Sequence, residues 1–381
     1  MDFSYDDEQT ALRDAVRGLL TRAYGDAGKR RQVVATDPGF DEKTWAALAE
    51  MGLLGLPFPE ESGGMGAGPV EVALVAEEVG RVLAPEPFVE AVVLAGGLVQ
   101  AAGSPAQREE LVGGLAEGSL VPAFAHAEPG TRWAPAASAV TATEDGGGWR
   151  LTGVKEPVPN GARADVLVVS AVAGGATRLF VVRGDAEGLS RTGYRTHDGT
   201  RAAKVEFAGS PAEPLGDAAD ATPVIERALA EARIAYAHEA VGAMETALTT
   251  TAEYLKTRKQ FGVTLNKFQA LTFRAADMYV SLELARSTAL WASLVVDADG
   301  SSDDAVVTAA DRARLQTSRA SRHIGKDAIQ LHGGIGVTAE YKVGHYTSRL
   351  TAIDHVLGDG DWALARLAAG VDAHETVDPL G

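Results

Sequence analysis

The segment Gln330-Leu331-His332-Gly333-Gly334-Ile335-Gly336 ends an Ala-rich helical stretch that begins near Thr308. Three glycines among four residues stop a helix, because glycine adopts positive φ and leaves backbone N–H groups free. Free N–H groups in such a loop can hold a phosphate. A plain C-cap and turn is the alternative, so the phosphate interpretation needs support from another part of the chain.

The second informative segment is Arg258-Lys259-Gln260-Phe261-Gly262, which is followed by Phe268-Gln269. It ends a long helical pattern that starts near Thr222, and helical spacing would place Arg258 and Phe261 on one face. A guanidinium beside an aromatic ring suits an anion joined to a flat ring, as in a dinucleotide. Taken alone, such a pair is more often an exposed Arg beside a core Phe.

Together the two segments resemble the acyl-CoA dehydrogenase family, and the resemblance extends over nearly the whole chain. It is closest to the small subunits of pimeloyl-CoA dehydrogenase and similar two-subunit enzymes. The matching segments are Asp2–Leu20, Met51–Pro57, Gly63-Gly64, Trp149–Lys155, Thr257–Gly262, Phe268-Gln269, Gln330–Gly336 and Glu340-Tyr341.

The resemblance implies an α+β fold with three domains. These are an N-terminal α-helical domain (residues 1–118), a middle antiparallel β-barrel or sandwich domain (119–221) and a C-terminal four-helix bundle (222–381). The hydrophobic pattern predicts the same parts, because short apolar or alternating runs separated by turn residues fill the stretch from Leu120 to Leu215. The helices predicted for the bundle are Thr222–Thr257, Leu265–Ala298, Asp303–Ile329 and Asp361–Ala369.

Composition excludes several classes of function. The chain has 381 residues and a net charge of −17, which would repel nucleic acids and anionic membranes. It has no cysteine, and therefore no disulfide, thiolate nucleophile or Cys metal site. No run approaches the roughly twenty apolar residues of a membrane span, and the acidic start lacks an apolar signal core, so we expect a cytoplasmic protein. His197 and His355 have no second ligand at a metal-binding spacing, so no metal site is expected.

The reaction that the resemblance implies is the α,β-desaturation of an acyl-CoA thioester to the trans-2-enoyl-CoA. A carboxylate base removes the α-proton, and FAD accepts the β-hydrogen as hydride. The adenine and pyrophosphate half of FAD is held across a subunit interface. The residues implied to hold it are Arg258, Phe261, Gln269, Gln330, Gly333 and Gly334, and all of them are present.

The segments that hold the flavin ring in the family look different here. The loop Ala127–Trp133 lacks the Ser-Asp that ends the family's Thr-Glu-Pro-Gly-Ser-Gly-Ser-Asp motif. The family's Trp-Ile-Thr-Asn segment appears as Pro157-Val158-Pro159-Asn160. Because Pro157 and Pro159 have no N–H, they cannot donate backbone hydrogen bonds to a flavin.

The catalytic base is missing from both positions that the family uses. One position holds Leu357 and the other holds Ala232, directly before Arg233. Glu239 lies about two helical turns beyond Ala232 and is the least unlikely substitute. The other carboxylates near these positions are expected to be solvated or capping groups; they are Glu231, Asp354, Asp359 and Asp361.

Three hypotheses follow. The first is a small, base-lacking subunit of a two-subunit enzyme, an α2β2 heterotetramer with a large acyl-CoA dehydrogenase subunit. The second is a self-sufficient homotetramer with an atypical base such as Glu239. The third is a flavin-free acyl-CoA-binding or scaffold protein. The first explains best why the residues facing a neighbour are intact while the chain's own cleft is degraded.

The resemblance also implies an electron-transferring flavoprotein as the electron acceptor. By analogy with the two-subunit members, the acyl group is dicarboxylyl, branched or steroid-bearing. The pathway is accordingly the degradation of fatty acids, steroid side chains or dicarboxylates.

Overall fold

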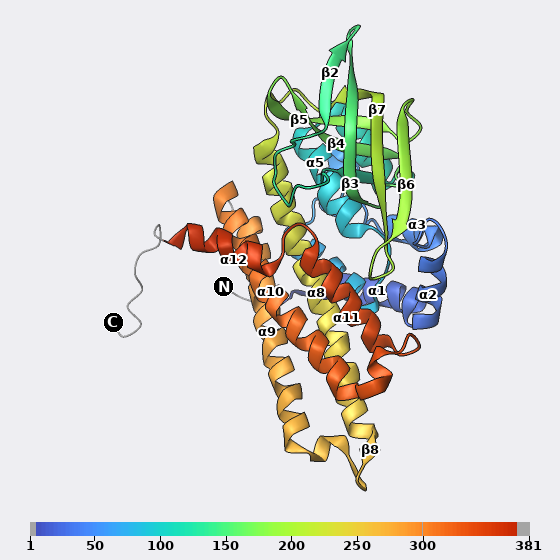
Figure 1. Ribbon diagram of the computed structural model, residues 1–381, viewed down its shortest axis with the longest axis vertical. Helices are drawn as coiled ribbons and strands as arrows, with labels where there is room; N and C mark the ends of the chain where they lie inside the picture. The colour runs from blue at the N-terminus through green and yellow to red at the C-terminus, as the bar shows by residue number, and fades with distance from the viewer. Residues whose placement is uncertain (1–4, 299, 372–381) are drawn as a thin grey trace.

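The computed structural model describes residues 5–298 and 300–371. It confirms the predicted fold class: helices come first, a β domain follows, and long helices form the C-terminal part (Figure 1). The β domain stands at one end of the molecule in this view, and the long helices extend from it toward the other end. The domain boundaries after residues 118 and 221 stay a prediction.

The N-terminal part is helical from Asp7 to Ala116. Asp6 caps the first helix through a capping box with Gln9. The elements are α1 (Asp7–Tyr24), α2 (Ala27–Ala35), α3 (Glu42–Glu50), η1 (Glu60–Ser62), α4 (Pro69–Val82), the π-helix η2 (Phe88–Gly96), α5 (Gly97–Ala102), α6 (Pro105–Gln107), the π-helix η3 (Arg108–Val112) and α7 (Gly113–Ala116).

The middle part is a closed barrel, and two further strands each pair with one of the barrel strands. Strands pair in the ring β4-β2-β3-β7-β5 and back to β4, while β1 pairs with β4 and β6 with β7. The strands are β1 (Pro122–Ala125), β2 (Thr141–Asp145), β3 (Gly148–Pro159), β4 (Val166–Ala173), β5 (Ala176–Arg183), β6 (Leu189–Arg195) and β7 (Arg201–Pro214).

Most pairings in the barrel are antiparallel, as predicted, but β1 and β2 run parallel to β4. The β2–β3 hairpin lies between β1 and β4 in the chain, and a connection of this length allows a parallel pairing. The barrel has its own apolar interior, whereas a single larger core joins the N-terminal helices, one face of β1 and β4, and the C-terminal helices.

The C-terminal part is a bundle of long helices. Its elements are α8 (Thr222–Thr257), β8 (Lys259–Gln260), β9 (Val263–Thr264), η4 (Leu265–Lys267), α9 (Gln269–Asp297), α10 (Asp303–His332), η5 (Gly333–Val337), α11 (Lys342–His355) and α12 (Gly360–Ala369). The sequence analysis missed α11, although its buried Val343, Tyr346, Leu350 and Ile353 follow helical spacing. Its predicted fourth helix is α12. No helix in the described ranges is long and apolar enough to cross a membrane.

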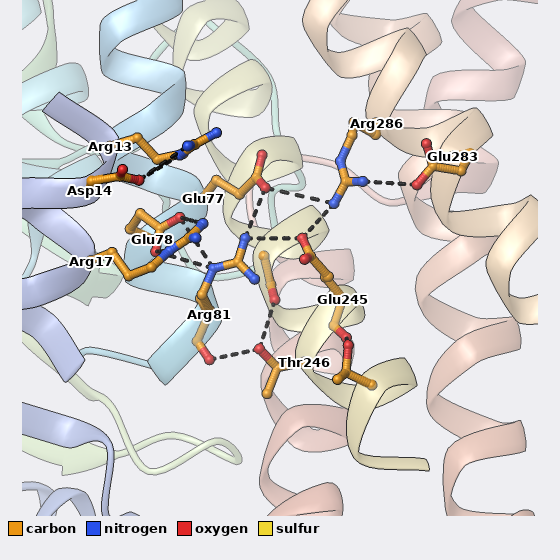
Figure 2. Close-up of polar contacts among 12 residues, drawn as sticks. Arg13, Asp14, Arg17, Glu77, Glu78, Arg81, Glu245, Thr246, Glu283 and Arg286 are labelled. Atoms are coloured by element: carbon orange, nitrogen blue, oxygen red, sulfur yellow. Dashed lines mark hydrogen bonds and ion pairs between the residues drawn. The ribbon is translucent and has the colours of Figure 1, made fainter. Parts of the chain in front are cut away.

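Helices α4 and α8 cross at very short distance. A β-carbon on Gly80 would collide with the carbonyl of Glu239, and one on Gly242 with the carbonyl of Glu77. Beside this contact, Arg81 of α4 donates to Glu78 at 3.1 Å and to Glu245 of α8 at 3.0 Å (Figure 2). Only glycine allows the two backbones this separation.

We therefore expect Gly242→Ala to destabilise the protein by about 1–3 kcal/mol, because the new methyl group has no space. Urea unfolding followed by circular dichroism measures this change. Gly97→Ala is the matched control, because Gly97 is helical and, among the residues that the structure describes, a β-carbon there meets no atom within 4 Å beyond its own helix backbone and chain neighbours. Its alanine should leave stability unchanged or raise it by up to about 1 kcal/mol. Equal effects of the two substitutions would contradict the close crossing.

Candidate functional site

Arg258 and Phe261 lie in a β-hairpin, not on a helix face. Helix α8 ends at Thr257, Arg258 is extended, and β8 pairs with β9. Phe261 and Gly262 form the turn with φ of +53° and +83°, the signs that a type I′ turn requires. The expectation of a shared helix face is therefore wrong, because the helix stops before Arg258. The turn presents the Phe261 ring to solvent, 92% exposed.

The glycine segment is open on one side. Gly333 ends α10 with φ 65° and ψ −145°, a conformation that essentially only glycine adopts. Within the described residues, a β-carbon on Gly333 or Gly334 would meet no atom within 4 Å. The space above this backbone is free for a ligand to approach.

Three aromatic rings join the hairpin to the glycine segment. The His332 ring lies 4.4 Å from that of Tyr254, one turn before Arg258, and 4.9 Å from that of Tyr341. The ends of α8 and α10 are thereby fixed side by side. Arg258, Gln269 and Gln330 are exposed at this end of the bundle, and their side chains make no hydrogen bond within the described part of the chain. The geometry suits recognition of a ligand held by a neighbouring subunit.

A separate cavity of about 70 Å³ lies where the barrel meets α8 and η2. It is the place where the two positions expected for the base meet. Leu357 lines the cavity, and Arg233, the neighbour of buried Ala232, lines it as well. The Nε of Arg233 donates to the carbonyl of Leu357 at 2.7 Å, so α8 is tied to the segment of Leu357 next to Ala232. Neither position carries a carboxylate.

Two carboxylates do line this cavity: Glu128, which is paired with Lys155, and Glu90, which the sequence analysis missed. Glu90 accepts a hydrogen bond from the Tyr236 hydroxyl at 2.7 Å. Burial raises the pKa of Glu90. A signal was available, because Glu90 is the one charged residue between Phe88 and Ala102, and a lone charge in an apolar helix needs a reason.

Glu239, the predicted substitute base, does not line the cavity. It is 2% exposed and accepts from the Nε of Arg349 at 2.6 Å. Arg349 also donates to Asp198 at 2.8 Å, so the three groups form a buried ion-pair cluster between α8, α11 and the barrel. The role of Glu239 as base stays a prediction, and this geometry does not favour it, because Arg349 holds the carboxylate in a structural pair.

The remaining carboxylates near the cavity have structural partners. Asp359 caps α12, as expected of a capping group, by accepting from the N–H of Trp362 at 2.8 Å. Asp354 is buried and accepts from Arg322 at 2.8 Å, so it is not the solvated group expected. Glu231 accepts from Arg227 on the same helix at 2.5 Å.

The loop Ala127–Trp133 is fixed by a buried ion pair. Lys155 is fully buried and donates to Glu128 at 2.8 Å. Burial alone would raise the pKa of Glu128, but hydrogen bonds from Lys155, Ser138 and the amide of Val140 lower it to about 2. Burial lowers the pKa of Lys155 to about 8 in spite of Glu128, so both groups are charged at neutral pH.

The two groups of residues expected to hold FAD differ in how they fit the cofactor. The open glycines, the exposed Phe261 ring and Arg258, whose side chain has no hydrogen bond in the described chain, fit its adenine and pyrophosphate half. The ring side does not fit: 70 Å³ is well below the roughly 300–1,000 Å³ of ligand sites. The indole ring of Trp133, which lines the cavity, packs edge to face with that of Trp362, and the two ring centroids lie 6.1 Å apart. The chain's own cleft therefore does not accommodate a flavin ring.

Glu128→Gln should destabilise the protein by about 3–5 kcal/mol, because it leaves the Lys155 ammonium buried without its counter-ion. Glu128→Gln/Lys155→Met should recover most of the loss. Since the pKa of Glu128 is lowered, its contribution is complete above the ordinary value of 4.5 and is lost as pH falls toward 2. The difference between wild type and Glu128→Gln should therefore narrow in urea unfolding below pH 4.5. A difference independent of pH would contradict an ionised Glu128.

Comparison with known proteins identifies the family. Models of the N-terminal, middle and C-terminal domains of acyl-CoA dehydrogenases match residues 6–119, 123–208 and 222–371. Acyl-CoA dehydrogenase IpdE2 of Mycobacterium tuberculosis is 32% identical over 368 residues, covering 96% of this chain and 98% of the relative.

Two solved structures extend the similarity. A variant of the Tcur3481-Tcur3483 steroid ACAD is 34% identical with a TM-score of 0.87, over 96% of this chain and 98% of that chain. The ChsE4-ChsE5 complex from Mycobacterium tuberculosis is 26% identical with a TM-score of 0.88, over 99% and 100%. With this coverage, the chain belongs to the acyl-CoA dehydrogenase family, whose members are FAD-dependent oxidoreductases that act on acyl-CoA.

Proposed function

We propose that this chain is the small, base-lacking subunit of a two-subunit acyl-CoA dehydrogenase. The larger partner supplies the base and the ring-side contacts of FAD. This chain supplies the hairpin with Arg258 and Phe261 and the loop with Gln330, Gly333 and Gly334, which bind the adenine and pyrophosphate half. The enzyme converts an acyl-CoA to the trans-2-enoyl-CoA and passes electrons to an electron-transferring flavoprotein.

The observation that carries this proposal is the contrast between the two ends of α8. At one end, the two positions expected for the base hold Leu357, which lines the cleft, and buried Ala232, whose neighbour Arg233 donates to the Leu357 carbonyl. At the other end, the residues expected to face a neighbour are exposed and unpartnered within the described chain. A self-sufficient enzyme would need both ends to be functional.

Exposed apolar side chains support assembly with another subunit. Phe273, Val280 and Leu284 on α9 are each more than half exposed. Val337 beside the glycine loop is 72% exposed. Apolar surface of this kind marks protein–protein interfaces. Together with the open glycine loop, it favours a partner that covers this end of the bundle and brings its own FAD.

The acyl group follows from the relatives. Two similar structures are named as a steroid ACAD and the ChsE4-ChsE5 complex. We propose an acyl chain attached to a bulky ring system as the substrate, and a heterotetramer as the assembly. The cytoplasmic location stays a prediction.

Flavin absorbance near 450 nm tests the subunit role. We expect no flavin in the chain purified alone, and about one FAD per pair of chains after co-expression with the large partner. The reason is that the ring-side cavity is too small in this chain. About one FAD per chain in the isolated protein, bleached by an acyl-CoA, would contradict the proposal and favour the homotetramer with Glu239 as the next residue to mutate. No flavin in either preparation would favour the scaffold hypothesis.

Arg258→Ala should lower FAD occupancy of the assembled enzyme by about tenfold or more under dilution, because one charged contact to the pyrophosphate is lost. Lys259→Ala is the matched control, since Lys259 is an exposed cation next to Arg258 in the same hairpin. Size-exclusion chromatography shows that the assembly persists. Unchanged flavin occupancy in Arg258→Ala would remove the pyrophosphate role.

A further inference from the structure

A second cavity, of about 200 Å³, lies between the N-terminal helices and the bundle and is lined by cations. It shares no lining residue with the cavity at Leu357. No Asp or Glu is among its lining residues in the described chain, although acidic residues outnumber basic ones 52 to 35 overall. The cationic residues that line it are Arg17, Arg30, Arg31, Arg81 and Lys342.

Carboxylates accept hydrogen bonds from two of these arginines and orient them. Glu78 accepts from Arg17 at 2.7 Å and from Arg81 at 3.1 Å (Figure 2). Arg17 uses Nε and Nη2 for Glu78, whereas Arg81 uses Nε for Glu78 and Nη2 for Glu77 and Glu245. The Nη1 of each guanidinium has no hydrogen bond within the described residues. The backbone of Arg81 is fixed too, because its carbonyl accepts from Thr246 at 2.9 Å and Tyr346 at 2.7 Å.

Arg30 is a buried cation without a carboxylate partner in the described part of the chain. It is 6% exposed, and its Nε and Nη2 donate to the carbonyls of Leu83 at 2.5 Å and Asp198 at 3.4 Å. Burial, with repulsion from Arg349, lowers the pKa of Arg30. The carboxylates of Asp198 and Glu239 attract Arg30 without bonding to it directly. A buried guanidinium that lacks a direct carboxylate contact costs free energy, and an anion in the cavity would offset part of that cost.

The remaining two cations stand at the mouth of the cavity. Arg31 donates one Nη1 hydrogen bond to the carbonyl of Ala339 at 2.8 Å, and its other nitrogens have no hydrogen bond to any described residue. Lys342 makes no hydrogen bond within the described residues, and burial lowers the pKa of its ammonium. Both side chains belong to exposed residues, so they can be replaced without opening the core.

We propose that this cavity binds a diphosphate group, as a second anion site distinct from the residues assigned to FAD. Within the described residues, Arg31 keeps Nε and Nη2 for paired hydrogen bonds to phosphate oxygens, and Arg17, Arg30 and Arg81 each keep Nη1. Several such groups around one cavity suit an anion of more than one charge. Neither Arg258 nor Gln330 lines the cavity. Free inorganic diphosphate and the diphosphate of an adenine nucleotide share this chemistry.

Isothermal titration of the full-length chain with sodium pyrophosphate, and separately with ADP, tests the site at low ionic strength. We expect saturable binding of one anion per chain. Arg31→Gln/Lys342→Gln should weaken it by about tenfold or more. The matched control is Arg22→Gln/Lys29→Gln, which removes the same charge from α1 and α2 at residues that do not line the cavity. Its Kd should stay within about twofold, because the lost charges are screened.

The possible results distinguish a nucleotide from free diphosphate as the ligand, and they show which findings would overturn the proposal. Tighter binding of ADP than of pyrophosphate assigns the site to a nucleotide, and equal binding assigns it to the diphosphate group alone. Absence of saturable binding, or an equal loss in the two double variants, would overturn the proposal. The proposal would also be overturned if Arg31→Gln/Lys342→Gln lost FAD from the complex with the large subunit, because the cavity would then belong to the FAD site. Circular dichroism of each variant shows that the fold is kept.

Discussion

The close crossing of α4 and α8 fixes the position of every other functional part. At Gly80 and Gly242, backbone meets backbone, so neither helix can slide or rotate against the other. Helix α8 has 36 residues and is about 54 Å long. It carries Arg233 and Tyr236 at the inner cavity and ends directly before Arg258. The crossing therefore sets the relation between the cleft and the hairpin, and the ion pairs of Arg81 reinforce it.

Buried arginines hold the segment around Leu357, which is one of the two positions expected for the base. Arg314 donates to the carbonyls of Ile353 and Val356, both at 2.8 Å, and Arg233 donates to that of Leu357. These carbonyls lie at and beyond the end of α11, where the regular helical donors run out, although that of Ile353 also accepts from the Val356 N–H at 3.1 Å. Arg349 adds the link between α11, Glu239 and the barrel. Although the chain is acidic overall, these arginines lie in its interior, where backbone carbonyl oxygens need hydrogen-bond donors.

Local pattern predicted most of the large elements, although α11 was missed. The β stretch, the helix start near Thr222 and the helix end at the glycines after His332 depend on neighbours in sequence, and they were predicted correctly. The failure at Glu239 involves a partner that is distant in the chain. Glu239 looked available because Arg349 lies 110 residues away.

The sequence identified candidate residues of the site better than it predicted how they are arranged in space. The hairpin at Phe261 depends on two successive positive φ angles, which helical spacing cannot reveal. Glu90 was overlooked because its partner, the Tyr236 hydroxyl, is brought near only by the packing of η2 on α8. Polar residues inside apolar helices are the positions at which sequence reasoning needs the tertiary structure most.

The hydrogen bond from Arg233 to the Leu357 carbonyl has a consequence for the history of the chain. If the base was lost, restoring a glutamate at Leu357 alone would place it in a cavity that Arg233 and Trp133 also line, still without flavin donors at Pro157 and Pro159. Several coordinated substitutions would then be needed to restore the site. Under the proposed subunit role, selection would see no benefit from the intermediate steps, so such a chain would evolve as an obligate companion and would not revert.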